Sequence, residues 1–152
     1  MSDYAASCRL RTGRYSCLGQ TYLVTSNTRN RTPIFRDFTA GRLLVRELRR
    51  AEEQGFANSL AWVVMPDHLH WLFELKAGTL DGLIQRVKAC SSRTINRHRS
   101  ITEPVWQSGY HDKALRAEDD LVKLARYTVN NPVRAGLVRR VGDYSLWDAI
   151  WV

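Results

Sequence analysis

The stretch 60–75, LAWVVMPDHLHWLFEL, decides the fold of this chain. Residues 60–65 form a short apolar run with β-branched and aromatic side chains, which predicts a buried strand. Pro66-Asp67 is a turn signal, and residues 68–75 have the apolar and aromatic content of a second strand. The two strands are therefore expected to pair as an antiparallel hairpin.

A strand and a helix precede the hairpin. Residues 20–27 (QTYLVTSN) are rich in Thr, Tyr and Val and predict a strand, and residues 30–33 predict a turn. Residues 39–54 predict a helix because their apolar side chains recur at helical spacing. Gly55 follows as the expected C-terminal cap.

A second helix, another strand and a third helix follow the hairpin. Residues 80–96 predict a helix with Thr79 as N-cap and with apolar and basic residues on opposite faces. A strand is expected within 105–116, and a last helix, which carries Tyr127, from about 118 to 130. This order of elements is that of a split βαβ unit. We therefore predict an α+β protein: a ferredoxin-like antiparallel sheet (βαββαβ) with helices on one face and an additional C-terminal helix.

The length and composition predict one domain and no membrane partner. The 152 residues fit a single domain over 1–152, with a basic N-terminal arm over 1–19 and a core over 20–145. The longest apolar stretch is far too short to span a bilayer, and the first residues lack the pattern of a secretory signal. Three scattered cysteines fit neither a disulfide framework nor a zinc motif, which is typical of the reducing cytoplasm.

The charge favours a nucleic-acid partner. The net charge is +8, and arginine supplies 19 of the 23 cations. Arginine binds phosphates and base edges through its planar fork, so two basic clusters, over 1–36 and 82–101, favour DNA or RNA. Solvated surface faces remain the alternative. The candidate DNA contacts are Arg9, Arg11, Arg14, Arg86, Lys88, Arg93, Arg97, Lys123 and Arg134.

His68 and His70 are candidate metal ligands. Residues i and i+2 of a strand point to the same face, so both imidazoles should project together. Two imidazoles side by side supply most of a minimal metal site. The alternative, which we rate ahead for an isolated HxH pair, is two structural histidines that satisfy local hydrogen bonds.

Tyr127 and Asn131 form a second constellation. They lie four residues apart, hence on one helix face if the helix persists through Asn131. A tyrosine can act as a nucleophile, and an asparagine oxygen suits Mg²⁺ or Mn²⁺. Lys123 lies one turn earlier on that face. The alternative is a core tyrosine and an asparagine cap before Pro132, where the helix is expected to end or kink.

Three segments of the chain resemble the HUH single-strand transposases, and most closely their branch of REP-associated tyrosine transposases. The segments are 65–72 (MPDHLHWL), 105–112 (VWQSGYHD) and 127–138 (YTVNNPVRAGLV). Residues 19–25 (GQTYLVT) are similar to the family's N-terminal strand. The resemblance covers roughly 20–145, and the last segment is highly specific.

The resemblance implies a function and a set of site residues. His68 and His70 would be metal ligands with Asn131 as the third ligand, Mg²⁺ or Mn²⁺ would be the metal, and Tyr127 would be the nucleophile. The implied activity is that of a metal-dependent single-stranded DNA endonuclease and strand transferase. Such an enzyme cleaves REP-like hairpin DNA through a 5′-phosphotyrosine intermediate, as a monomer or homodimer.

Two rival functions stay open at this point. A catalytically silent regulator of the same fold would bind hairpin DNA without turnover, and a metal-dependent hydrolase would use the two histidines and a water. The chain contains no P-loop, Rossmann or GxSxG motif, so nucleotide binding of those types and serine-hydrolase chemistry are unsupported.

Overall fold

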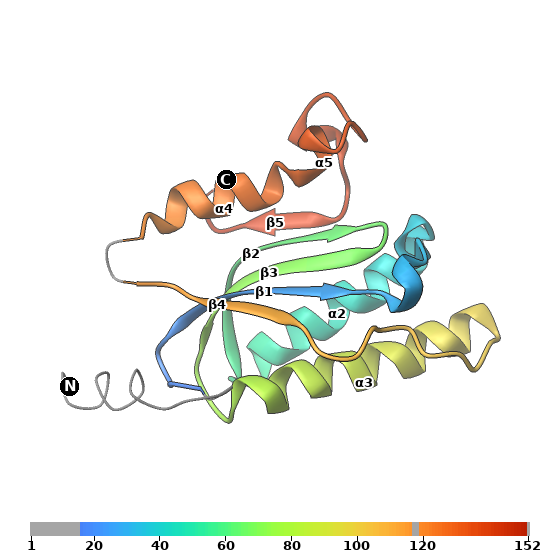
Figure 1. The fold of residues 1–152 in the computed structure, drawn as a ribbon, viewed down its shortest axis with the longest axis horizontal. Helices are drawn as coiled ribbons and strands as arrows, with labels where there is room; N and C mark the ends of the chain where they lie inside the picture. Colours follow the sequence, from blue (N-terminus) through green and yellow to red (C-terminus); the bar gives the residue numbers. More distant parts are fainter. Residues whose placement is uncertain (1–15, 117–118, 152) are drawn as a thin grey trace.

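One antiparallel sheet organises the chain. The computed structural model describes residues 16–116 and 119–151. The strand order is β4-β1-β3-β2-β5 (Figure 1). The strands are β1 (Thr21–Asn27), β2 (Ala57–Met65), β3 (His68–Leu75), β4 (His111–Ala114) and β5 (Trp147–Ala149). The first four strands follow the order 4-1-3-2 with antiparallel neighbours. The predicted α+β fold with a ferredoxin-like sheet is confirmed.

Two long helices, α2 (Phe38–Glu53) and α3 (Leu80–Arg99), cover one face of the sheet (Figure 1). Thr79 caps α3 by accepting a hydrogen bond from Gly82 N at 3.0 Å, as predicted. The predicted cap after α2 is also found: Gly55 has φ +78°, a value that glycine adopts without strain.

The main core lies between the sheet and this pair of helices. Alternate residues of β3, among them Leu69, Trp71 and Phe73, pack here and are at most 3% exposed. Trp62 and Trp71 both belong to this core and are at most 5% exposed. Trp71 satisfies its ring nitrogen by donating to Ser59 Oγ at 2.9 Å.

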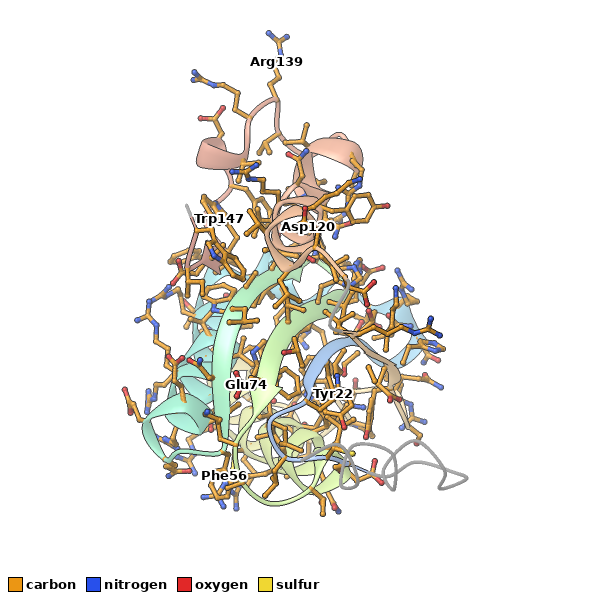
Figure 2. All side chains as sticks on the ribbon, turned by 90° about the vertical axis from the view of Figure 1, so that its left-hand side faces the viewer. Tyr22, Phe56, Glu74, Asp120, Arg139 and Trp147 are labelled. Carbon is orange, nitrogen blue, oxygen red and sulfur yellow. The ribbon has the colours of Figure 1, made fainter. Side chains whose placement is uncertain are left out.

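The opposite face of the sheet carries α4 (Leu121–Val129) and α5 (Asn131–Arg134). Ala125 and Val129 of α4 pack with Leu72 of β3 in a second, smaller core. Figure 2 shows Asp120, which precedes α4, beyond the face of the sheet opposite the two long helices. Within the described residues, none of the helices is long and apolar enough to cross a membrane.

The C-terminal segment departs from the predicted pattern. The sequence did not predict β5, which pairs with the edge of β2 through Ala149, Asp148 and Trp147. Tyr144 anchors the same segment by donating its hydroxyl to the Val64 carbonyl. Only three residues long, β5 has too few side chains to produce a periodicity; its pairing with β2 forms it.

Three further boundaries differ from the prediction. The strand β2 begins at Ala57 instead of residue 60, because the ladder with β3 continues through Asn58 and Ser59 despite their low strand propensity. The helix α3 runs to Arg99 and ends at Ser100, whose φ is +56°. Short 3₁₀ helices occur at Arg29–Arg31, Ile34–Arg36 and Val141–Asp143.

Of the three scattered cysteines, Cys8 lies outside the described residues, and Cys90 of α3 is a free thiol.

Candidate functional site

His68 and His70 lie side by side on the face of the sheet that α4 covers. Side chains alternate along a strand, and both histidines share the face of Leu72, which packs against α4. Their ring centroids are 4.7 Å apart and their planes meet at 84°. The prediction that the HxH spacing brings the two imidazoles together is confirmed, although their role as ligands stays a prediction.

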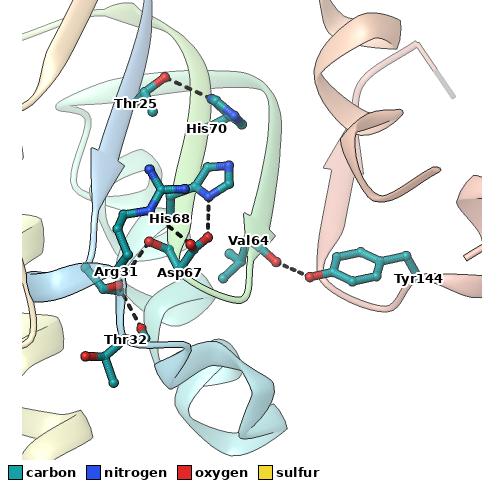
Figure 3. Close-up of polar contacts among 9 residues, drawn as sticks. Thr25, Arg31, Thr32, Val64, Asp67, His68, His70 and Tyr144 are labelled. Carbon is teal, nitrogen blue, oxygen red and sulfur yellow. Dashed lines mark hydrogen bonds and ion pairs between the residues drawn. The ribbon is translucent and has the colours of Figure 1, made fainter. Parts of the chain in front are cut away.

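Each ring is held through its Nδ1 atom (Figure 3). His70 Nδ1 lies 2.9 Å from Thr25 Oγ1, and Thr25 is its direct partner across the β1–β3 ladder. His68 Nδ1 lies 2.7 Å from Asp67 Oδ1, a carboxylate that accepts its hydrogen. With Nδ1 occupied by these contacts, Nε2 is the atom through which each ring can bind a cation. In metal sites, a hydrogen bond from the second ring nitrogen to a carboxylate or another oxygen fixes the orientation of the ligating histidine in this way.

Asp67 links His68 to a nearby cation. Its second oxygen, Oδ2, accepts from Arg31 Nε at 2.9 Å. Desolvation by burial raises the pKa of Asp67, but hydrogen bonds and charge from His68 and Arg31 outweigh it, so the net pKa is lowered. The carboxylate is therefore ionised at neutral pH and orients the His68 ring.

The environment of His70 keeps its imidazole neutral. Burial, and then the positive charges of His68, Arg134 and Arg31, lower the pKa of His70 from 6.5 to about 4. A neutral imidazole offers a lone pair, which is the form that binds a metal. The donor set of the two rings thus fits a divalent cation.

The third predicted ligand, Asn131, begins α5 close to the end of α4. Its Nδ2 atom donates to the Thr128 carbonyl at 3.0 Å, so the side-chain oxygen is the end that would bind a cation. In residues 16–116 and 119–151, no three His, Cys, Asp or Glu side chains cluster as metal ligands. Two histidines and one amide therefore remain the predicted set.

Tyr127 is an exposed residue of α4, on the same side of the sheet as the histidines. Its side chain is 62% exposed, and the guanidinium carbon of Arg134 lies 3.6 Å from the centre of its ring. Arg134 also lowers the pKa of His70 through its charge. Arg134 therefore contacts the tyrosine and adds positive charge that acts on His70.

The helix does not persist through Asn131. The helix α4 ends at Val129, Asn130 forms the junction, and α5 begins at Asn131. The predicted end or kink before Pro132 is confirmed, so Tyr127 and Asn131 do not share one continuous helix. Lys123 and Tyr127, one turn apart within α4, are both exposed, so Tyr127 is not a core residue.

The predicted DNA contacts fall into separate groups. Arg9, Arg11 and Arg14 lie outside the described residues. Lys123 and Arg134 are exposed near Tyr127. On α3, Arg86, Arg93 and Arg97 are exposed, but this helix covers the face of the sheet opposite the histidines.

Lys88 of α3 has a structural role in addition. Its ammonium group donates to the carbonyls of Gln107 and Gly109, and it lies 6.0 Å from the centre of the Trp106 ring. These contacts hold the segment after residue 104 against α3.

Sequence reasoning missed the residues that orient the two rings. Asp67 appeared only as a turn residue, although its position next to His68 in PDHLH was a usable signal. Thr25 and Arg31 are distant in sequence from the histidines and gave no signal of their own, because the β1–β3 register brings Thr25 to His70.

The sequence matches the family model for IS200-like transposases over residues 18–131. The chain is 28% identical over 131 residues to the REP-associated tyrosine transposase of Escherichia coli K12, covering 86% of this chain and 77% of that protein. It is 26% identical over 115 residues to a Haemophilus influenzae protein described as a candidate transposase of this kind, covering 66% and 65%. A solved REP-associated tyrosine transposase bound to a REP hairpin has the same fold, with a TM-score of 0.73 and 24% identity over 90% of this chain and 81% of that one.

Proposed function

Since the chain belongs to the family of IS200-like transposases, we propose that it is an HUH-type enzyme that nicks and rejoins single-stranded DNA beside REP-like hairpins. The observation that carries the proposal is the pair of imidazoles, 4.7 Å apart and held through Nδ1, on the side of the sheet where α4 exposes Tyr127.

Tyr127 is the proposed nucleophile. Its hydroxyl oxygen attacks the scissile phosphorus, forming a 5′-phosphotyrosine, and the bond from phosphorus to the 3′ oxygen breaks. The phenol proton passes to water, and the leaving 3′ oxygen takes a proton from water, so the departing strand ends in a free 3′-OH. Because the new bond is again a phosphodiester, the attack of a 3′-OH reverses the step and joins strands without ATP.

His68 and His70, through Nε2, and Asn131, through its side-chain oxygen, are the proposed ligands of Mg²⁺ or Mn²⁺. Such a cation, when bound, offsets negative charge on the scissile phosphate. The chain's own residues prepare the site: Asp67 and Thr25 fix the rings. Two nitrogens and one amide oxygen are a neutral set, so Mn²⁺ is expected to serve at least as well as Mg²⁺.

Arg134 is proposed to guide the phosphate to the tyrosine. Its guanidinium group lies against the Tyr127 ring and acts electrostatically on His70. A scissile phosphate that reaches Tyr127 therefore meets a cation able to form charge-assisted hydrogen bonds.

The test is covalent trapping on REP-type hairpin DNA with Mn²⁺. The wild-type protein is expected to form an SDS-resistant adduct that Tyr127→Phe does not form, whereas the matched control Tyr110→Phe keeps it. An adduct on Tyr127→Phe would refute the nucleophile, and cleavage without any adduct would favour the hydrolase. Hairpin binding without cleavage at any divalent metal would favour the silent regulator.

A further inference from the structure

The helix α2 presents a row of arginines that the proposed chemistry does not use. Arg42, Arg46, Arg49 and Arg50 are all exposed. They line, with Thr39, Leu43 and Glu53, an open groove of about 520 Å³ along the helix. At about 1.5 Å per residue, the first three of these arginines follow one another roughly once per turn, every 4.5 to 6 Å along the axis.

Three glutamates of α2 offset part of the charge of this row. Glu47 is 5% exposed, and its ion pair with Arg50 at 3.3 Å compensates the charge of that arginine. Glu52 accepts a hydrogen bond from Ser59 N at 3.0 Å, and Glu53 is the acid within the groove. Arg42, Arg46 and Arg49 therefore leave a net positive stripe.

The stripe continues a basic surface on α3. The two helices lie antiparallel, because Asp37 at the start of α2 contacts His98 at the end of α3, and Gln54 after α2 accepts from Arg86 near the start of α3. Arg93 of α3 is also exposed. The helical layer thus carries arginines along both of its members.

This layer is separated from the proposed catalytic site by the sheet. The residues of α2 and α3 pack with Trp71, whereas His68 and His70 point to the opposite face. The nucleotides of a DNA strand that bind at the histidines therefore cannot also contact the α2 stripe. Any DNA on the stripe is a different segment from the one at the histidines.

The chemistry of the stripe fits a duplex backbone. The helix has one exposed ring, Phe38 in its first turn, and from Arg42 to Gln54 the sequence has no Trp, Tyr or Phe. The arginines therefore have no rings between them on which successive unpaired bases could stack, as single-strand surfaces do. A row of arginines binds phosphates without reading bases. We propose that α2, through Arg42, Arg46 and Arg49, binds the phosphate backbone of duplex DNA on the face opposite the catalytic site.

The proposal rests on the proposed function only in taking DNA as the partner. Its test is fluorescence anisotropy with a 20-base-pair duplex of mixed sequence, without hairpin or cleavage site, in a salt series from 50 to 200 mM. Neutralising three contacts in Arg42→Gln/Arg46→Gln/Arg49→Gln is expected to reduce the slope of log affinity against log salt by about 2 to 3. Binding at 100 mM salt should weaken at least tenfold.

The matched control removes the same charge elsewhere. Lys76→Gln/Arg139→Gln/Arg140→Gln neutralises three exposed cations outside α2 and should keep most of the wild-type slope. An unchanged slope in the α2 variant, or an equal loss in the control, would overturn the proposal. The same titration is run with one strand of the duplex alone and with an RNA duplex of the same length. The proposal is also overturned if the α2 variant loses as much affinity for the single strand as for the duplex, or if the wild-type protein binds the RNA duplex more tightly than the DNA duplex.

A second measurement separates this inference from the proposed function. The α2 variant should melt like the wild type and form the Tyr127 adduct on a short single-stranded substrate at the wild-type rate. If no variant forms an adduct while the slopes change as expected, the catalytic proposal fails and the duplex surface stands. If adducts form and the slope does not change, the duplex surface fails alone.

Discussion

Replacing Asp67 by asparagine is expected to weaken Mn²⁺ binding by roughly ten- to thirtyfold. The carboxylate accepts from His68 Nδ1 at 2.7 Å and from Arg31 at 2.9 Å. A hydrogen bond to a charged group contributes about 1.5 to 3 kcal/mol. Because Asp67 is 27% exposed, solvent screens the contact, and we take about 1.4 to 2 kcal/mol, where 1.4 kcal/mol is tenfold. Asparagine also leaves the Arg31 charge without its counterion beside the site.

The assay is isothermal titration calorimetry of Mn²⁺ with DNA-free protein at pH 7.5. The matched control is Glu74→Gln, which removes one negative charge from β3, the strand that follows Asp67, where Glu74 contacts Lys76 at 3.0 Å. This control should bind Mn²⁺ like the wild type. The reasoning is refuted if Asp67→Asn, folded as judged by its melting curve, stays within threefold of the wild type, or if Glu74→Gln loses as much.

Three further predictions concern stability and the tyrosine. Burial raises the pKa of Tyr144 to about 12, so the unfolded chain loses the phenol proton at a lower pH than the folded protein. The free energy of unfolding, measured by urea titration, should therefore fall as pH rises from about 10 to 12, and Tyr144→Phe should lack this part of the decline. A Cβ at Gly41 would overlap Leu146, so Gly41→Ala should lower the free energy of unfolding by about 1 to 3 kcal/mol. In a double-mutant cycle, Leu146→Ala should cost less stability in the Gly41→Ala background than in the wild type, because it removes the side chain that the new Cβ overlaps. Arg134→Gln should change the free energy of unfolding by less than about 1 kcal/mol, because its contact with Tyr127 is exposed, yet it should slow adduct formation at least tenfold; an unchanged rate would remove Arg134 from the site.

The sequence predicted those parts of the fold that have a strong local pattern. The strand His68–Leu75 was predicted with its observed bounds, because a turn signal and an apolar run delimit it. The strand β5 was not predicted, since only its contact with β2 distinguishes residues 147–149 from a loop. The early start of β2 at Ala57 was missed for the same reason.

The same distinction applies to the candidate site. The period of a strand was enough to place His68 beside His70. The contact of Thr25 with His70 depends on how β1 pairs with β3, and the stacking of Arg134 on Tyr127 depends on the direction in which α5 leaves α4. Both are three-dimensional facts that no local pattern encodes.

The two outer strands of the sheet also bear on how copies of this protein can meet. The strand β4 has four residues, all exposed, and includes Asp112 and Lys113, while β5 has three residues. Short edge strands offer a neighbouring chain few backbone groups to pair with. Charged side chains on an edge strand further disfavour pairing, because they would have to be desolvated against the added strand. Two molecules that associate are therefore expected to gain little from joining their sheets into one.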